Sequence, residues 1–215
     1  MPSPPAALDL RVAPSPEAAG RAAADAAEAA LRAALARQET ARVVFAAAPS
    51  QLPMLEELRT RDAVDWRRVH AFHMDEYIGL GTDAPQRFGT WLRTAFLDHV
   101  PIGAAHVIEP GADPVAAAAD YAERLARAPL DLVCLGIGVN GHLAFNDPPV
   151  ADLDDPHDVK VVELDEICRR QQVDDGCFAD IGQVPRRALT LTVPRLLRAH
   201  RIVGTVLGRR KSEAV

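Results

Sequence analysis

Apolar runs alternate with amphipathic stretches along this chain, and the alternation predicts β-strands separated by α-helices. An alanine-rich stretch with Arg and Glu on its outer face predicts a first helix from Pro16 to about Gln38. Further strands are predicted at 42–48, 67–74, 131–137, 159–163, 187–192 and 201–207, and further helices near 51–60, 85–98, 113–128, 165–172 and 193–199. Elements in this order predict an α/β fold, a three-layer αβα arrangement with a mostly parallel, Rossmann-like sheet and helices on both faces.

The predicted elements form one domain. Residues 1–16 are rich in proline and are expected to be loose, whereas residues 17–215 are expected to form a single α/β domain without an internal repeat. A chain of 215 residues and 23.1 kDa is long enough to bury one core. Residues 211–215 have the pattern of a first helical turn that does not continue, so the domain looks short at its C-terminus.

The charge pattern argues against nucleic acid and membranes as partners. The net charge is −6, and no basic patch of the kind that binds nucleic acid is present. No apolar run reaches the 18 residues or more that a membrane-spanning helix needs. The N-terminus lacks a basic segment followed by an apolar core, so it does not predict a signal peptide. We therefore expect a cytoplasmic protein.

Cysteine and acidic residues do not predict a metal centre. The three cysteines, Cys134, Cys168 and Cys177, lack C-x-x-C spacing, which favours reduced thiols over a zinc site. Clustered carboxylates between residues 152 and 158 could hold a hard cation, but a solvated loop is the favoured interpretation. We expect no metal.

The segment from Cys134 to Pro149, CLGIGVNGHLAFNDPP, carries the strongest chemical signal. An apolar run leads into a turn with three glycines, and polar side chains including His142 follow. The glycines match G-x-G-x-x-G, but a dinucleotide site also needs a long helix opening at the third glycine. Pro148 and Pro149 stop such a helix after a turn or two, so a nicotinamide site is disfavoured.

A second motif lies in RRVHAFHMDEYIGL, residues 67–80, where Asp75 and Glu76 come at the end of a predicted strand. Ligands of open parallel sheets bind outside the carboxyl ends of the strands. Asp75 and His142 would therefore face one cleft. Taken singly, each motif slightly favours an ordinary interpretation, a solvated turn for Asp75-Glu76 and a loop histidine for His142. The two together, at two strand ends, favour an active site.

MDEYIGL and LGIGVNGHLAFNDPP resemble the two signature segments of the glucosamine-6-phosphate deaminase family, which is related to the 6-phosphogluconolactonases. Residues 86–100 and 184–211 also resemble this family. The resemblance implies ring opening by His142, proton transfer between C2 and C1 by Asp75, and loss of ammonia to leave fructose 6-phosphate. A buried aspartate suits this role because burial raises the pKa of a carboxyl toward neutrality.

The chain departs from the family pattern at two positions near His142. Asn140 stands where many members have aspartate, and Asp147 stands where many have glutamate. An amide can hydrogen-bond an imidazole but cannot take up a proton as a carboxylate does. Asp147 keeps the charge on a shorter side chain, and its reach to His142 decides whether it can hold the imidazole. The resemblance thus implies Asp75, His142, Asn140 and Asp147 as the catalytic set.

Phosphate recognition is expected in the loop after the first predicted strand. The family usually has a Gly-Gly-Ser/Thr-Pro loop there, whereas this chain has Ala47-Ala48-Pro49-Ser50-Gln51. Lys211 matches the family's phosphate lysine, although it is equally compatible with an ordinary surface lysine. The residues that the resemblance implies for substrate binding are Ser50, Gln51, Glu76, Gly138, Gly141 and Lys211.

Three functions from different classes fit these residues. The first is an amino-sugar phosphate deaminase or isomerase, which MDEY and FNDPP favour. The second is a lactonase in which His142 activates water. The third is a sugar-phosphate-binding protein without catalysis, which Asn140 and the altered loop leave open. In each case the expected partner is a small-molecule sugar phosphate, no cofactor is expected, and a homo-oligomer is compatible with the sequence.

Overall fold

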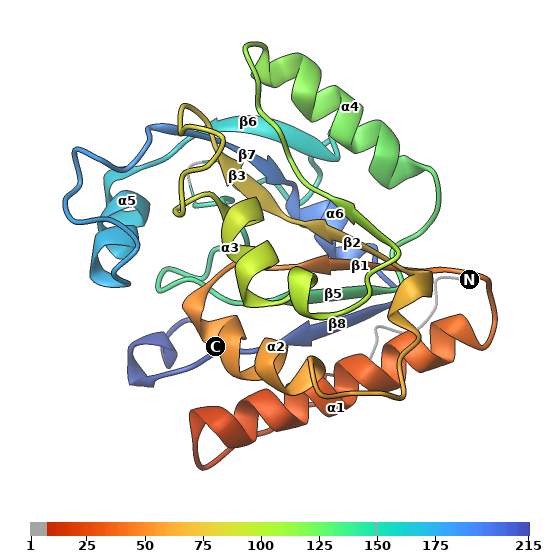
Figure 1. The fold of residues 1–215 in the computed structure, drawn as a ribbon. Coiled ribbons are helices and arrows are strands. Elements are labelled where there is room, and N and C mark those ends of the chain that lie inside the picture. The colour runs from red at the N-terminus through yellow and green to blue at the C-terminus, as the bar shows by residue number, and fades with distance from the viewer. Residues whose placement is uncertain (1–7, 149) are drawn as a thin grey trace.

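The computed structural model describes residues 8–148 and 150–215. Its central sheet has five parallel strands in the order β4-β2-β1-β5-β8 (Figure 1). These strands are β1 Ala41–Phe45, β2 Val69–His73, β4 Ala104–His106, β5 Leu132–Leu135 and β8 Arg201–Gly204. The α/β fold with a parallel central sheet is therefore confirmed. Strand β4 was not predicted, because three half-buried residues leave too short a pattern to detect.

A second, smaller sheet is antiparallel, in the order β3-β7-β6. Its strands are β3 Asp75–Tyr77, β6 Val159–Glu163 and β7 Arg187–Leu191. The sequence placed β6 and β7 in the same sheet as the other strands, whereas they pair with β3 and with each other. The chain passes from the central sheet to the second sheet at Met74, directly after β2. The Met74 carbonyl accepts a hydrogen bond from Leu191 N at 2.8 Å. Periodicity identifies a strand but does not say which strand it pairs with.

The helices are α1 Pro16–Leu35, α2 Leu52–Leu58, α3 Phe88–Ala95, α4 Pro114–Ala126, α5 Glu166–Asp174 and α6 Val193–Leu197. Four of them begin at a side-chain cap, formed by Ser15, Asp113, Asp165 and Thr192. Helices α1 and α2 lie along one face of the central sheet, and α4 lies on the other side (Figure 1).

Strand β1 explains the three layers. All five of its residues are buried, and all but Arg42 are apolar, so both faces of the strand carry apolar side chains. Val43 and Phe45 belong to the cluster that includes α1, α2 and α3, whereas Val44 belongs to the cluster that includes α4 and α6. Side chains of a strand alternate between faces, so one short strand contributes to two cores.

The ends of the chain bear on the predicted domain limits. Residues 1–7 and Pro149 lie outside the described residues, and residues 8–14 form no helix or strand before α1 begins at Pro16. Near the other end Arg209–Lys211 form one 3-10 turn. The division at residue 16 remains a prediction. Within the described ranges, we find no helix that combines the length and the apolar character needed to cross a membrane.

Candidate active site

Three loops meet at the carboxyl end of the central sheet. They follow β1, β5 and β8, and Gln51 joins the first to the third because its Nε2 donates to Thr205 O at 3.2 Å. Gly136, at the end of β5, lies close to both Ser50 and Gln51. The segment after β5 continues into the loop that holds His142. This edge is where an open parallel sheet is expected to bind its ligand.

His142 is held in a polar network within its own loop. Its Nδ1 lies 2.6 Å from Asn140 Oδ1 and 2.9 Å from Asp147 Oδ1. Asn140 Nδ2 donates to the same Asp147 oxygen at 2.9 Å. Burial alone would raise the pKa of Asp147, but hydrogen bonds from His142 and Asn140 outweigh burial and keep that pKa below its usual value. The shorter carboxylate therefore does reach the histidine, and it is ionised when it does so.

Two glycines shape this loop in different ways. The His142 ring lies directly against Gly138, where a Cβ atom would approach three ring atoms to under 3.0 Å. Gly141 has a φ of +85°, a left-handed conformation that glycine adopts readily. Asn146 fastens the far end of the loop, because its Nδ2 donates to Leu143 O and Leu191 O, each at 2.8 Å. Gly138 thus supports the imidazole, and Gly141 makes the turn.

Asp75 lies at the start of β3 and is buried, with 7% of its surface exposed. Burial, and after it the neighbouring Glu76 carboxylate, raise the pKa of Asp75 well above its usual value. Asp75 lies opposite Thr190 in the antiparallel pairing of β3 with β7. Thr190 Oγ1 in turn accepts a hydrogen bond from Phe145 N at 3.1 Å. Thr190 therefore ties the strand that carries Asp75 to the loop that carries His142.

Glu76, which is expected to bind substrate, lies against the start of α3. Its side chain has no exposed surface, and its carboxylate accepts hydrogen bonds from Phe88 N at 3.1 Å and Gly89 N at 3.0 Å. These are the first backbone donors of α3, and the buried Arg87 guanidinium lies 3.5 Å from the same carboxylate. Successive residues of a strand point to opposite faces, so the side chains of Asp75 and Glu76 lie in different surroundings. Glu76 anchors α3.

The predicted phosphate residues fall in different environments. Ser50 and Lys211 are each partly exposed, whereas Gln51 has no exposed surface at all. The Gln51 amide, which is expected to contact the substrate, donates hydrogen bonds within the protein, to Ser50 and Thr205. Burial lowers the pKa of Lys211, and the nearby Asp175 acts in the opposite direction. Lys211 follows β8 and so belongs to the same end of the sheet.

The sequence did not predict the buried residues that pack around the candidate site. His73, the last residue of β2, is buried, and its Nε2 accepts a hydrogen bond from Ile108 N at 2.8 Å. The buried Tyr121 hydroxyl accepts from His73 N at 3.0 Å. Cys168 of α5 lies beside Asp147. Only His73 could have been identified from the sequence, because it directly precedes the MDEY motif. Tyr121 of α4 and Cys168 of α5 contact the site from distant segments, and a local sequence pattern does not reveal such contacts.

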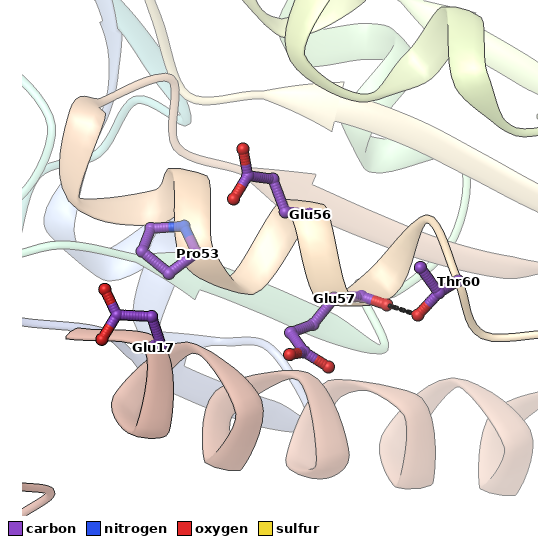
Figure 2. Close-up of a pocket in the computed structure, with 5 residues that line it drawn as sticks. All are labelled: Glu17, Pro53, Glu56, Glu57 and Thr60. Carbon is purple, nitrogen blue, oxygen red and sulfur yellow. Dashed lines mark hydrogen bonds between the residues drawn. The ribbon is translucent and has the colours of Figure 1, made fainter. Parts of the chain in front are cut away.

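No cluster of three or more His, Cys, Asp or Glu suited to a metal ion occurs in residues 8–148 and 150–215. In the acidic stretch after Pro149, Asp155 is bound by Lys160, and Asp158 is bound by Arg195 and Arg198. A cavity of about 190 Å³ lies between α1 and α2, lined by Glu17, Pro53, Glu56, Glu57 and Thr60 (Figure 2). None of these lining residues belongs to the candidate site.

Comparison with known proteins decides the family. The model of the family described as glucosamine-6-phosphate isomerases/6-phosphogluconolactonase matches residues 14–215. The chain belongs to this family. The resemblance that the two signature segments carried is thereby confirmed, and within the family the residues around His142 and Asp75 form the candidate active site.

Curated members of the family are similar over much of the chain. Glucosamine-6-phosphate deaminase from Exiguobacterium sp. (strain ATCC BAA-1283 / AT1b) is 36% identical over 72% of this chain, and the match spans 59% of that relative. Glucosamine-6-phosphate deaminase from Arthrobacter sp. (strain FB24) is 33% identical over 97% of this chain and 79% of the relative. The chain thus spans between about three fifths and four fifths of the length of these relatives.

Solved structures in this family share the fold. A monomeric glucosamine-6-phosphate deaminase superimposes with a TM-score of 0.78 at 23% identity, over 87% of this chain and 77% of that one. The 6-phosphogluconolactonase from Thermotoga maritima gives a TM-score of 0.72 at 20% identity, over 90% of this chain and 82% of that one. Both branches therefore have the same architecture, and the fold does not separate the two activities.

Proposed function

We propose that this chain is a glucosamine-6-phosphate deaminase, which converts glucosamine 6-phosphate and water to fructose 6-phosphate and ammonia. The observation that carries the proposal is the network at His142. Asp147 and Asn140 Oδ1 both approach Nδ1, so Nδ1 carries the proton of the neutral ring. The lone pair is then on Nε2, which is the nitrogen available to act as a base. The deaminase relatives support this activity over that of a lactonase.

His142 performs ring opening in this proposal. Nε2 takes the proton from the C1 hydroxyl, the C1–O5 bond breaks, and the proton is delivered to O5, which gives the open aldehyde. Asp147 stabilises the imidazolium that forms in between, because its ionised carboxylate lies 2.9 Å from Nδ1. Asn140 fixes the orientation of both partners without adding a second negative charge.

Asp75 performs the isomerisation. Its carboxylate removes the proton from C2 while the C1 oxygen takes a proton from the substrate's own ammonium group, which gives an enolamine. The carboxyl then returns its proton to C1, which leaves an iminium at C2. Water adds to C2, a proton of that water passes to the nitrogen, and ammonia departs to give fructose 6-phosphate. A carboxyl whose pKa is raised by burial suits this double role, because it holds the proton taken from C2 more firmly than an exposed aspartate until it returns that proton to C1. No step in this sequence requires a cofactor.

The test follows ammonia and fructose 6-phosphate together after addition of glucosamine 6-phosphate. Equal release of both is expected, and Asp75→Asn or His142→Ala should lower the rate by about 10²-fold to 10⁴-fold. Asp62→Asn and His200→Ala, at exposed positions, are matched controls that should keep the wild-type rate. A normal rate in Asp75→Asn would refute the mechanism.

Two other outcomes would replace the proposal. Hydrolysis of a sugar-phosphate lactone without deamination would make the chain a lactonase. Binding of hexose 6-phosphates without any turnover would make it a sugar-phosphate-binding protein. A sugar phosphate is the partner that the proposal requires; a cytoplasmic location and a homo-oligomeric state remain predictions.

A further inference from the structure

Ser50, Gln51 and Gly136 form a compact polar group where the loops after β1 and β5 meet the loop after β8. Gln51 Nε2 lies 3.2 Å from Ser50 Oγ and 3.2 Å from Thr205 O. A Cβ on Gly136 would come within 3.3 Å of both Ser50 Oγ and Gln51 Nε2, so the glycine allows this close approach. Gln51 is fully buried, whereas Ser50 remains partly exposed.

The orientation of the Gln51 amide is fixed by its neighbours. Thr205 O is a backbone carbonyl and can only accept a hydrogen bond, so the amide atom that faces it must be the donor, Nε2. The NH₂ group has two hydrogens, and the second points to Ser50 Oγ. A flipped amide would set two carbonyl oxygens against each other. Gln51 is therefore a donor to Ser50.

This orientation decides what the Ser50 hydroxyl can do. A hydroxyl has one hydrogen to donate and lone pairs that accept. Because the Gln51 amide occupies a lone pair of Oγ, the Ser50 O–H hydrogen is directed away from Gln51 and is available to an acceptor outside. The half-exposed position of Ser50 lets a ligand oxygen reach it.

We propose that Gln51 is a positioning residue that makes Ser50 a hydrogen-bond donor to the phosphate of the substrate. The inference rests on the proposed function for the phosphate itself. A phosphate oxygen only accepts, so a serine whose hydrogen is already pointed outward binds it without reorienting. Lys211, which follows Thr205 on the same loop, supplies positive charge at this end of the sheet. Gln51 acts from behind Ser50 and does not touch the substrate.

The experiment measures kcat and KM for glucosamine 6-phosphate in Gln51→Met, Ser50→Ala and the double variant. Methionine matches the length of glutamine and removes both amide hydrogens. A hydrogen bond to a charged group, when lost, changes binding about 10-fold to 100-fold. We expect KM to rise by about that factor in Ser50→Ala and by about 10-fold in Gln51→Met, with kcat changed little. In the double variant KM should equal that of Ser50→Ala, since the two residues act as one unit.

A binding measurement keeps the test independent of turnover. Calorimetric titration with fructose 6-phosphate and with fructose separates the contribution of the phosphate. In wild type we expect fructose 6-phosphate to bind more tightly than fructose, and Gln51→Met should reduce that advantage about tenfold while leaving fructose binding unchanged. Gln183→Met, at an exposed glutamine, is the matched control.

Gly136→Ala is the second variant if Gln51→Met does not fold. The added methyl would press on both Ser50 and Gln51 and should raise KM in the same way. The inference is wrong if a folded Gln51→Met variant keeps the wild-type KM, or if it loses fructose binding as much as fructose 6-phosphate binding. It is also wrong if wild type binds the two sugars equally. A wild type that shows the phosphate-dependent binding but no deamination would leave the inference standing and refute the proposed function alone.

Discussion

Gly138→Ala tests the contact that supports His142 without changing the histidine itself. A methyl group at this position would come closer than 3.0 Å to Cε1, Nε2 and Nδ1 of His142. Carbon atoms in contact are normally about 3.5 Å apart or more, so the ring must retreat by about 1 Å or more. The ring cannot do this without leaving Asn140 and Asp147, which now lie 2.6 and 2.9 Å from Nδ1.

The expected loss follows from this displacement. A shift of about 1 Å in a catalytic group can reduce the rate about 10²-fold. Loss of the charge-assisted bond to Asp147 alone corresponds to about 10-fold to 100-fold. We therefore expect kcat for glucosamine 6-phosphate deamination to fall about 10²-fold. Overpacking should lower the free energy of unfolding by about 1–3 kcal/mol, which leaves the protein folded at 25 °C for a domain of ordinary stability.

The assay compares kcat with the free energy of unfolding from urea denaturation, so that a poorly folded variant is recognised. Gly81→Ala is the matched control, because a Cβ there meets nothing within 4 Å, and both properties should stay at wild-type values. A Gly138→Ala variant with wild-type kcat would show that the imidazole does not depend on this contact, and the reasoning about the loop would fail.

Three further predictions concern the buried titratable groups. Because burial raises the pKa of Asp75, the contribution of Asp75 to the free energy of unfolding is complete only below the usual aspartate pKa and is lost as the pH rises. Asp75→Asn should therefore raise Tm more at pH 7.5 than at pH 4. An equal change in Tm at both pH values would contradict this linkage. Burial lowers the pKa of His73 to about 3, so its contribution is lost as the pH falls from about 6.5 toward 3, and His73→Gln should flatten that limb of the Tm profile. Glu76→Gln replaces one of the two accepting oxygens by an NH₂ group, so that either Phe88 N or Gly89 N loses its acceptor. This change should destabilise the fold by about 1–3 kcal/mol in urea denaturation, with kcat less affected than Tm, and an unchanged unfolding midpoint would show that Glu76 does not anchor α3.

The central layers were predictable because they depend on local patterns. Strand β1 is apolar except for Arg42, and the chain places α1 before it and α2 after it with recognisable starts, at Ser15-Pro16 and near Pro53. The glycine-rich loop and His142 were identified for the same reason, since the residues of the turn are neighbours in sequence. Even the contact from Asp147 to His142 spans only five positions.

Pairing between distant segments could not be predicted in this way. The departure of the chain at Met74 into a second sheet depends on β7, which lies more than 100 residues further along. The burial of Gln51 depends on Thr205, and the role of Glu76 depends on the start of α3. In each case the residue type at one position fits two roles, and the partner that selects between them is supplied by another part of the chain.

The sequence by itself therefore determined the αβα layering, the position of the loop at the end of β5, and the family to which the two signature segments belong. Tertiary structure alone decided that Glu76 accepts hydrogen bonds from the start of α3 and that the Gln51 amide donates to Ser50 and Thr205. The physical reason is range: hydrophobic periodicity and turn chemistry act between neighbours in sequence, whereas burial and hydrogen-bond partners are fixed only when remote segments pack together.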